Sequence, residues 1–417
     1  MPNRNYFILF LSFIFLVGAF ALFNAGYQPE NEKEVQKSQV ANNKESLDLK
    51  EEAEGDSEKE EKENKEEEAK NIEDSEERED VENGEKGREV TKIKGEEGFL
   101  NCLYEVRVPS PKAVSFSPDG EELWVTSLMN ERAGLFIFNS ETGTGKKELK
   151  LPGGGGVEII FASSAGYVSQ METGRAFKIE NREIQEIYDS GSVWSKAFAF
   201  SPNYQKLYLS NWVGNDVSEF DDSGKLIRKI PTVETPRGIS VVNDSLYVAG
   251  FKNGEIQKID LQTGDSKIIF STGGAMRDAE TDGKNIYFSD MAMGKIYSAT
   301  PEGEVVKITK TDRNPNTIRL TPDSKILVIS NRGINNPESY YLPGPEWGSL
   351  LFFDLEKKEI IGSHIGGNQT TGLSISPDGN LLAYSDFLDH RVTVCEFPDE
   401  DSFSNWSIEE HKRKINK

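Results

Sequence analysis

The sequence has few residues of the kinds that build disulfide scaffolds or metal clusters. Its 417 residues include only 2 cysteines and 3 histidines. Two cysteines exclude a multi-disulfide scaffold and a cluster of four thiolates, and three histidines are too few to indicate a histidine-rich metal site. A net positive charge is also missing, because 71 acidic side chains outnumber 48 basic ones. Without a positive field to neutralise phosphates, we do not expect the chain to bind nucleic acid.

Catalytic sequence motifs are scarce as well. The chain contains no His-Glu-x-x-His, no Gly-x-Ser-x-Gly and no phosphate-binding loop. The Gly143-Thr144-Gly145-Lys146 segment lacks the spacing and the following Ser or Thr of such a loop. The sequence therefore favours a protein without catalytic activity, with one enzymatic alternative considered below.

A charge-free apolar run occupies residues 6–23, preceded by Arg4 as the only charged side chain. Its length nearly spans the hydrocarbon core of a bilayer and exceeds the apolar core of a typical signal peptide. We expect residues 1–29 to be an uncleaved helical signal-anchor, with a cleaved signal peptide as the alternative. In either case the remainder of the chain is exported, to the periplasm or to the cell surface.

Residues 30–97 have a different composition from the rest of the chain. Acidic side chains outnumber basic ones there by 27 to 13, and no aromatic residue is present. Such a segment cannot bury enough apolar area to offset its chain entropy. We expect a disordered, self-repelling linker that holds a domain away from the membrane. A specific acidic docking segment is the alternative.

From residue 98 onward the sequence repeats. Each unit has a short apolar strand, a turn rich in Pro, Asp and Gly, and a second strand that ends in Ser-Asn or Ser-Asp. Matched small residues give the period: Ala197 to Gly238 and Gly238 to Ala279 are both 41 residues. A degenerate unit at 157–180 completes a set of seven. Four short strands in a unit of about 40 residues predict an all-β fold, a seven-bladed β-propeller over residues 98–397.

The repeats resemble a known family. Ser117-Pro118-Asp119-Gly120, followed by Leu123-Trp124-Val125-Thr126, is similar to the core of the YVTN-type repeat propellers, which include surface-layer proteins. The match covers about residues 100–397 and is weaker in the other units. The resemblance implies a propeller that serves as a binding or structural module, with its binding face around the central channel.

Closure of the ring is predicted from an uneven strand count. The last unit supplies only three strands, whereas an additional strand at 101–109 precedes the first complete unit. An open propeller would expose an unpaired edge, so we expect this N-terminal strand to complete the last blade. Alignment with the first unit places Cys102 at the position of Gly145 and Cys395 at that of Phe138, which face each other across a hairpin. This predicts a Cys102–Cys395 disulfide; the alternative is two unrelated small apolar residues.

Four cations occupy matching positions just before the innermost strands. Because these positions meet at one mouth of the channel, they predict a site for an anion or carboxylate. Polar residues at the ends of the second strands lie nearby, either as further ligands or as structural partners of the cations. The cations are Lys112, Lys196, Arg237 and Arg277, and the polar residues are Asn211, Asp290, Asn331 and Asp386.

An insertion at residues 331–349 adds aromatic side chains to the same face. Tyr340, Tyr341 and Trp347 are candidates for contact with a partner or ligand. The alternative is a loop that packs on itself and covers the channel.

Together these features predict an exported, membrane-tethered, monomeric binding scaffold without a cofactor. Its partner would be a protein or a small anionic ligand at the channel face, and residues 398–417 would form a C-terminal tail. The alternative is a metal-dependent lactonase-like hydrolase, since sugar lactonases also use propellers. Calcium would then need oxygen ligands from Glu158 and from the four polar residues that end the second strands.

Overall fold

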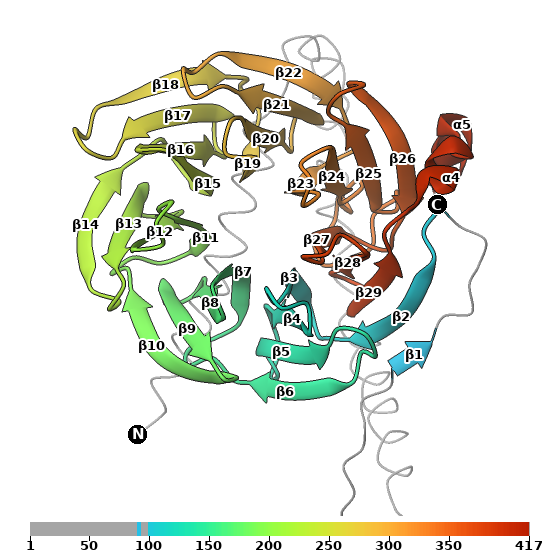
Figure 1. Ribbon diagram of the computed structural model, residues 1–417, viewed down its shortest axis with the longest axis horizontal. Helices are drawn as coiled ribbons and strands as arrows, with labels where there is room; N and C mark the ends of the chain where they lie inside the picture. The colour runs from blue at the N-terminus through green and yellow to red at the C-terminus, as the bar shows by residue number, and fades with distance from the viewer. Residues whose placement is uncertain (1–89, 93–98, 417) are drawn as a thin grey trace, which may run out of the picture. The chain divides into compact units, whose positions relative to one another are not determined.

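Seven antiparallel sheets are arranged around a central channel like the blades of a propeller (Figure 1). The computed structural model describes residues 90–92 and 99–416. Six sheets have four strands and the last has five. The seven-bladed propeller predicted from the repeat period is therefore confirmed. The predicted signal-anchor and almost all of the predicted linker lie outside the described residues. Within the described residues, no helix is long and apolar enough to cross a membrane.

The two inner strands of each blade carry the repeat that is visible in the sequence. The second strands are almost entirely buried, because other strands of the blade flank them and neighbouring blades cover their faces. The innermost strands line the channel: β3 (Pro111–Phe116), β7 (Gly156–Ala162), β11 (Ser195–Phe200), β15 (Pro236–Val242), β19 (Met276–Thr281), β23 (Pro315–Leu320) and β27 (Thr370–Ile375). The second strands are β4 (Glu122–Ser127), β8 (Ala165–Gln170), β12 (Lys206–Asn211), β16 (Ser245–Gly250), β20 (Ile286–Asp290), β24 (Ile326–Asn331) and β28 (Leu381–Asp386).

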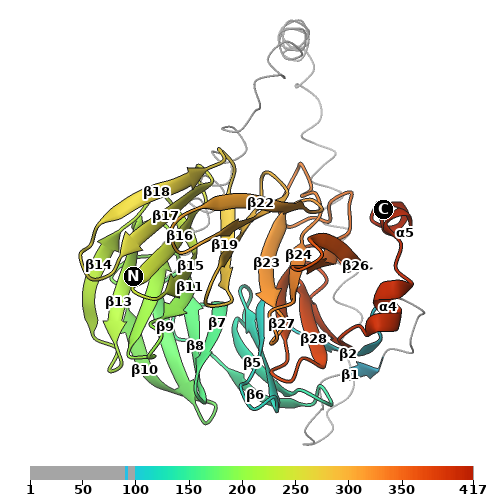
Figure 2. The same ribbon diagram turned by 45° about the horizontal axis from the view of Figure 1, so that its top comes forward.

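The outer strands close each blade toward solvent, and the fourth strands are the most exposed (Figure 2). The third strands are β5 (Gly134–Asn139), β9 (Arg175–Glu180), β13 (Asp216–Asp221), β17 (Glu255–Asp260), β21 (Lys295–Ala299), β25 (Ser349–Asp354) and β29 (Arg391–Glu396). The fourth strands are β6 (Gly145–Leu149), β10 (Glu183–Asp189), β14 (Leu226–Pro231), β18 (Ser266–Ser271), β22 (Val305–Lys310), β26 (Glu359–Ile365) and, in the last blade, β2 (Cys102–Arg107).

The turn between the first two strands has the chemistry that its sequence predicts. The Ser117 hydroxyl donates to the Asp119 carboxylate at 2.5 Å and accepts from the Glu122 amide at 2.9 Å. Gly120 takes a φ of 77°, which a side chain would disfavour. The same Ser-to-Asp contact recurs at Ser376 and Asp378. These turns set the register in which each innermost strand pairs with the second strand.

The N-terminal strand completes the last blade as predicted. Strand β2 pairs with β29, and Cys102 is directly opposite Cys395. A disulfide joins the two cysteines across 293 residues of sequence. In the first blade Phe138 and Gly145 are paired in the same way, which confirms the alignment that predicted the bond.

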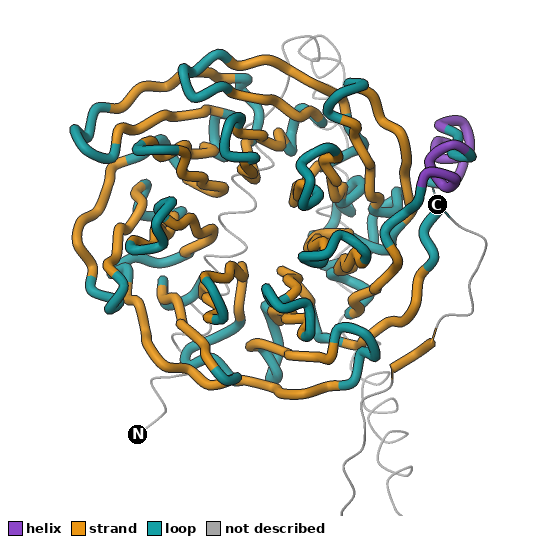
Figure 3. Tube along the Cα trace, in the orientation of Figure 1, coloured by secondary structure: helices purple, strands orange, loops and turns teal. Residues whose placement is uncertain are grey.

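Two regions contain elements that the sequence analysis did not predict. Strand β1 (Val90–Lys92), expected to lie in the disordered linker, pairs with the free edge of β2. That edge offers unpaired backbone groups, which explains why a short segment without a core can still form a strand there. The C-terminal tail contains two helices, α4 (Glu400–Ser404) and α5 (Ile408–Lys414), beside the outer edge of the propeller (Figure 3).

The helices are attached through specific contacts. The Trp406 indole donates to the Ser363 hydroxyl at 2.7 Å, which ties the segment to β26. His411 contacts the Asp312 carboxylate at 2.8 Å, and the Trp347 amide donates to the Ile415 carbonyl at 3.0 Å. The C-terminus therefore also holds the base of the 331–349 insertion.

Candidate functional site

The second residue of each innermost strand contributes to a ring at one end of the channel. Four of these seven residues are the predicted cations; the others are Val157, Asn316 and Thr371. Lys112, Arg237 and Arg277 line one small cavity together with Asn316 and Thr371. In each innermost strand the pairing register shifts beside this residue, as between Ser195 and Phe198 in β11. Such bulges redirect side chains, and here they accompany the ring residues at the channel mouth.

The ring cations are removed from solvent. Lys196, Arg237 and Arg277 expose no more than 9 % of their surface. Burial lowers the pKa of Lys112, and the positive charges of Arg277, Arg332, Arg237 and Lys196 lower it further. Like charges are thus held together in a poorly hydrated place, which is costly unless an opposite charge joins them.

Lys196 and Arg277 experience the same forces, whereas the pKa of Arg237 is lowered by burial and raised by Glu158 and Asp278. The pKa of Lys196 is lowered by burial and then by Arg237 and Arg277. Burial also lowers the pKa of Arg277, with Arg237 and Arg332 acting in the same direction. A guanidinium group nevertheless stays protonated in proteins, so Arg237 and Arg277 keep their positive charge.

Arg332 is a fifth cation that the sequence reasoning missed. It follows the last residue of β24, is 3 % exposed, and donates to the Gln369 side chain at 2.6 Å. Its guanidinium carbon lies 4.4 Å from the centre of the Tyr340 ring. The residue does not match a ring position of the repeat, and its place at the start of the insertion is the only sequence signal for it.

Aromatic side chains surround the cations. The Lys196 ammonium lies 5.0 Å from the Trp194 ring and 5.5 Å from the Trp212 ring. The Lys112 ammonium lies 5.5 Å from the Phe387 ring, which is 5.9 Å from the Tyr340 ring. These contacts are in the range of cation–π interactions. Two separate groups of aromatic rings thus lie beside the charged ring, one at Lys196 and one at Lys112 and Arg332.

The three aromatic residues predicted in the insertion have different positions. Tyr340 is at the channel mouth, as its contacts with Arg332 and Phe387 show. Tyr341 is 40 % exposed and packs edge-on against Tyr340. Trp347 lies where the insertion meets the C-terminal segment, through its backbone contact with Ile415. Contact of these residues with a partner or ligand stays a prediction.

A hydroxyl near the end of the second strand fixes the backbone of the ring. The Ser210 hydroxyl accepts from the Ala197 amide at 3.0 Å and donates to the Arg237 carbonyl of the next blade at 2.8 Å. It thus joins two blades at a ring residue. The same donation to the next blade is made by Ser169 to Lys196, Ser289 to Asn316, Ser330 to Thr371 and Ser385 to Lys112.

The polar residues that end the second strands lie inside the blades. All four are fully buried. The Asp290 carboxylate accepts from the Ala275 amide at 2.9 Å, and that of Asp386 accepts from Thr370 and Arg391 at 2.6 and 2.9 Å. The side-chain carbonyl of Asn211 accepts from the Ser195 hydroxyl at 2.7 Å. Within residues 99–416 no hydrogen bond or ion pair joins these four polar residues to the four predicted cations. The alternative in which Asn211, Asp290, Asn331 and Asp386 are structural partners of the cations is therefore not formed.

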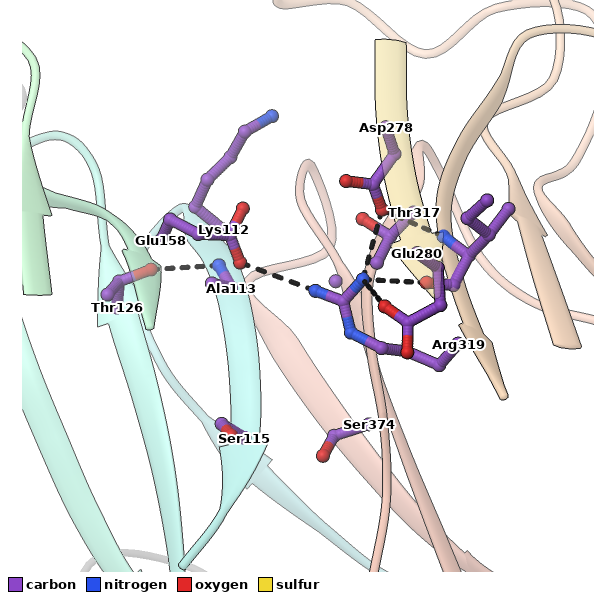
Figure 4. A network of polar contacts seen from close by, with 12 residues as sticks. Lys112, Ala113, Ser115, Thr126, Glu158, Asp278, Glu280, Thr317, Arg319 and Ser374 are labelled. Atoms are coloured by element: carbon purple, nitrogen blue, oxygen red, sulfur yellow. Dashed lines mark hydrogen bonds and ion pairs between the residues drawn. The ribbon is translucent and has the colours of Figure 1, made fainter. Parts of the chain in front are cut away.

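Arg319 crosses the channel below the ring (Figure 4). It belongs to β23, and its guanidinium lies 3.5 Å from the Glu158 carboxylate of β7 on the other side. It also contacts Asp278 at 3.0 Å and Glu280 at 3.5 Å. Figure 4 shows Lys112 on one side of this bridge and Ser115 on the other. The cavity between ring and bridge measures about 10 Å³, room for about one water.

Burial favours the neutral form of two carboxyl groups of this bridge. Burial raises the pKa of Glu280 to about 7, and Asp278 and Glu158 add to the rise while Arg319 opposes it. Burial also raises the pKa of Glu158. Three carboxyl groups thus share one guanidinium. Glu158, offered above as a calcium ligand, is engaged with Arg319, and among the described residues no group of three or more His, Cys, Asp or Glu is arranged to hold a metal ion.

Comparison with known proteins identifies one relative by sequence. The chain is 33 % identical over 245 residues to Antigen Lp49 of Leptospira interrogans, and the match covers 55 % of this chain and 54 % of that protein. The chain thus spans about half the length of the relative it matches. No family model matches the chain.

Solved structures share the fold at low identity. The Kuenenia stuttgartiensis hydrazine synthase has a TM-score of 0.57 at 16 % identity, over 69 % of this chain and 96 % of that chain. A streptogramin B lyase has a TM-score of 0.57 at 14 % identity, over 72 % and 96 %. A chain of the mitotic checkpoint complex reaches 0.59 at 11 % identity, over 77 % and 99 %. These similarities show the propeller fold alone.

Proposed function

We propose that this chain is an exported, membrane-tethered propeller that binds a small organic anion at the ring of cations, without catalysis. The observation that carries the proposal is the convergence of four buried cations and the partly buried Lys112 at one channel mouth. An anion at their centre would replace mutual repulsion by attraction, and the guanidinium groups of Arg237 and Arg277 offer paired donors suited to a carboxylate or phosphate.

The surroundings of the ring favour an anion with an apolar body. The space below the ring holds only about one water, so the charged group of a ligand would stay at the level of the ring. Its body would then contact the aromatic rings of Phe387 and Tyr340, which lie beside Lys112 and Arg332. A monocarboxylate or phosphate monoester with an aromatic or aliphatic body fits this arrangement.

Export and tethering are supported by independent features. The apolar run at 6–23 and the acidic segment at 30–97 have the compositions of an anchor and a spacer. A structural disulfide agrees with an oxidising compartment. The relative of 33 % identity is named an antigen, which is compatible with a propeller outside the membrane. The similarity of the repeats to YVTN-type propellers points the same way.

Titration calorimetry of the full chain tests the proposal, with benzoate, phenyl phosphate and inorganic phosphate as probes. We expect saturable binding of one anion per chain. The double variant Arg237→Gln/Arg277→Gln should weaken it by at least about 100-fold, because two charge-assisted contacts are lost. The matched control, Arg132→Gln/Arg175→Gln, removes two exposed arginines and should bind like the parent chain.

Thermal unfolding separates binding from folding. Without anion, the ring variant should be at least as stable as the parent chain, since buried like charges are removed. Phosphate should raise the midpoint of the parent and not that of the variant. Equal binding by both proteins, or unfolding of the variant at room temperature, would overturn the proposal. Calcium-dependent turnover of a lactone would replace it by the hydrolase alternative.

A further inference from the structure

The channel has a second cavity at the end opposite the ring. It measures about 530 Å³ and is lined by the last residues of β7, β11, β15 and β19 and by the turns that follow them. This volume lies in the range of sites for small organic molecules. The Arg319 bridge lies between this cavity and the ring, so the two ends of the channel are distinct sites.

Aromatic side chains form one wall of the second cavity. Phe161, Phe198, Phe200 and Tyr204 all line it. Tyr204 is 60 % exposed, and its ring lies 5.6 Å from that of Phe200. A large exposed aromatic beside a hollow is typical of binding surfaces.

Glu280 lies at the inner end of this cavity. The groups that face it are Arg319 from β23, Glu158 from β7 and Asp278 from its own strand. Among the described residues, Arg319 forms ion pairs with all three carboxylates, whereas Arg237 attracts only Glu158 and Asp278, so the least compensated carboxylate is that of Glu280. When they are ionised, the inner end of the cavity carries an excess of negative charge. A cation placed beside Glu280 would balance that excess.

We propose that the second cavity binds an organic ammonium ion with an apolar body. Its charged nitrogen would lie beside the Glu280 carboxylate, and its body would contact Phe161, Phe200 and Tyr204. The electrons of these rings attract a cation, so wall and carboxylate favour the same ligand. This site is separate from the anion site proposed above and does not depend on it.

Binding of 2-phenylethylammonium to the full chain tests this inference. The neutral 2-phenylethanol has nearly the same shape and should bind at least about tenfold more weakly. Glu280→Gln should weaken binding of the ammonium ion about tenfold and leave the alcohol almost unaffected. Tyr204→Leu changes a side chain that is 60 % exposed and should weaken binding of the ammonium ion by about two- to fivefold. Glu131→Gln, an exposed change on the opposite face, is the matched control.

The pH dependence supplies a further readout. Because burial raises the pKa of Glu280 to about 7, affinity for the ammonium ion should rise between about pH 6 and pH 8, and Glu280→Gln should abolish the rise. Equal affinity for ammonium and alcohol, or binding of Ca²⁺ in place of the ammonium ion, would overturn the inference. Arg237→Gln/Arg277→Gln should retain ammonium binding, so failure of the anion site remains distinguishable.

Discussion

Lys112 and Lys196 hold their protons less firmly than lysines in water. Their pKa values are lowered first by burial and then by neighbouring cations. Between the lowered pKa and the ordinary value of about 10.5, the unfolded chain binds more protons than the folded one. The contribution of these lysines to stability therefore rises with pH through that window. A bound anion has the opposite effect on the pKa, because it favours the charged form.

Anion binding should therefore be coupled to proton uptake. At a mildly alkaline pH, about 8.5, we expect a fraction of a proton to be taken up for each phenyl phosphate bound, and affinity to fall as pH rises. Calorimetry in two buffers of different ionisation enthalpy measures the uptake. Lys112→Arg/Lys196→Arg keeps both charges and should bind without the uptake. Uptake that persists in this variant would assign the protons to other groups.

Sequence reasoning at this scale succeeded where residues occupy equivalent repeat positions. Lys112, Lys196, Arg237 and Arg277 could be brought together because they match in the repeat, although each stands second in its innermost strand rather than before it. Arg332 could not, since it lies outside the repeat pattern and reaches the ring through the insertion. Arg319 bridges strands that are four blades apart in the order of the chain, and no spacing in the sequence indicates that its partner is Glu158.

At the scale of elements, five blades position their neighbour through a serine hydroxyl. A bulge in the innermost strand directs a side chain to the channel mouth, and a hydroxyl from the adjacent second strand fixes the following blade. Two blades differ from this pattern: Ala249 stands at the serine position of the fourth blade, and Thr126 stands there in the first blade, where its hydroxyl accepts from the Ala113 amide. Sequence reasoning recognised the Ser-Asn and Ser-Asp strand ends as a repeat feature. It could not assign the serine to the next blade, since that contact exists only in the closed ring.

Removing one such hydroxyl should loosen the ring. Ser210→Ala leaves the Ala197 amide and the Arg237 carbonyl without this partner, and unsatisfied buried groups cost about 1–3 kcal/mol. We expect the free energy of unfolding in urea to fall by about this amount. Anion binding should become weaker as well. Ser266→Ala, on the exposed strand β18, should change neither quantity. Unchanged stability and binding in Ser210→Ala would show that the ring does not depend on these hydroxyls.

Short elements without a repeat partner were the hardest to predict. Strand β1 has only three residues and follows an acidic segment, so nothing in its composition distinguishes it. Helices α4 and α5 are likewise short, and their place is set by tertiary contacts such as that of Trp406 with Ser363. Propensity alone decides little for helices of this length.

At the scale of the whole molecule, the fold depends on joining the two ends of the repeat array. The uneven strand count was sufficient to predict this closure, because an unpaired edge in a propeller is unfavourable. The hydrogen bonds between β2 and β29 make the joint, and the Cys102–Cys395 bond lies at one end of it. Every other blade is made from consecutive strands, so the last blade is where the ring can open.

The disulfide should therefore control both stability and the place where unfolding begins. A bond that closes a loop of 293 residues lowers the entropy of the unfolded chain. In the chain-entropy model this raises the free energy of unfolding by about 5–6 kcal/mol. Cys102→Ser/Cys395→Ser should lower the midpoint of thermal unfolding and speed amide exchange first in residues 102–107 and 391–396. Exchange in β12, remote from the joint, serves as the internal control. Because the strand pairing itself remains, the variant should still bind anions in the cold. Uniform acceleration across all blades would show instead that the ring opens without a preferred joint.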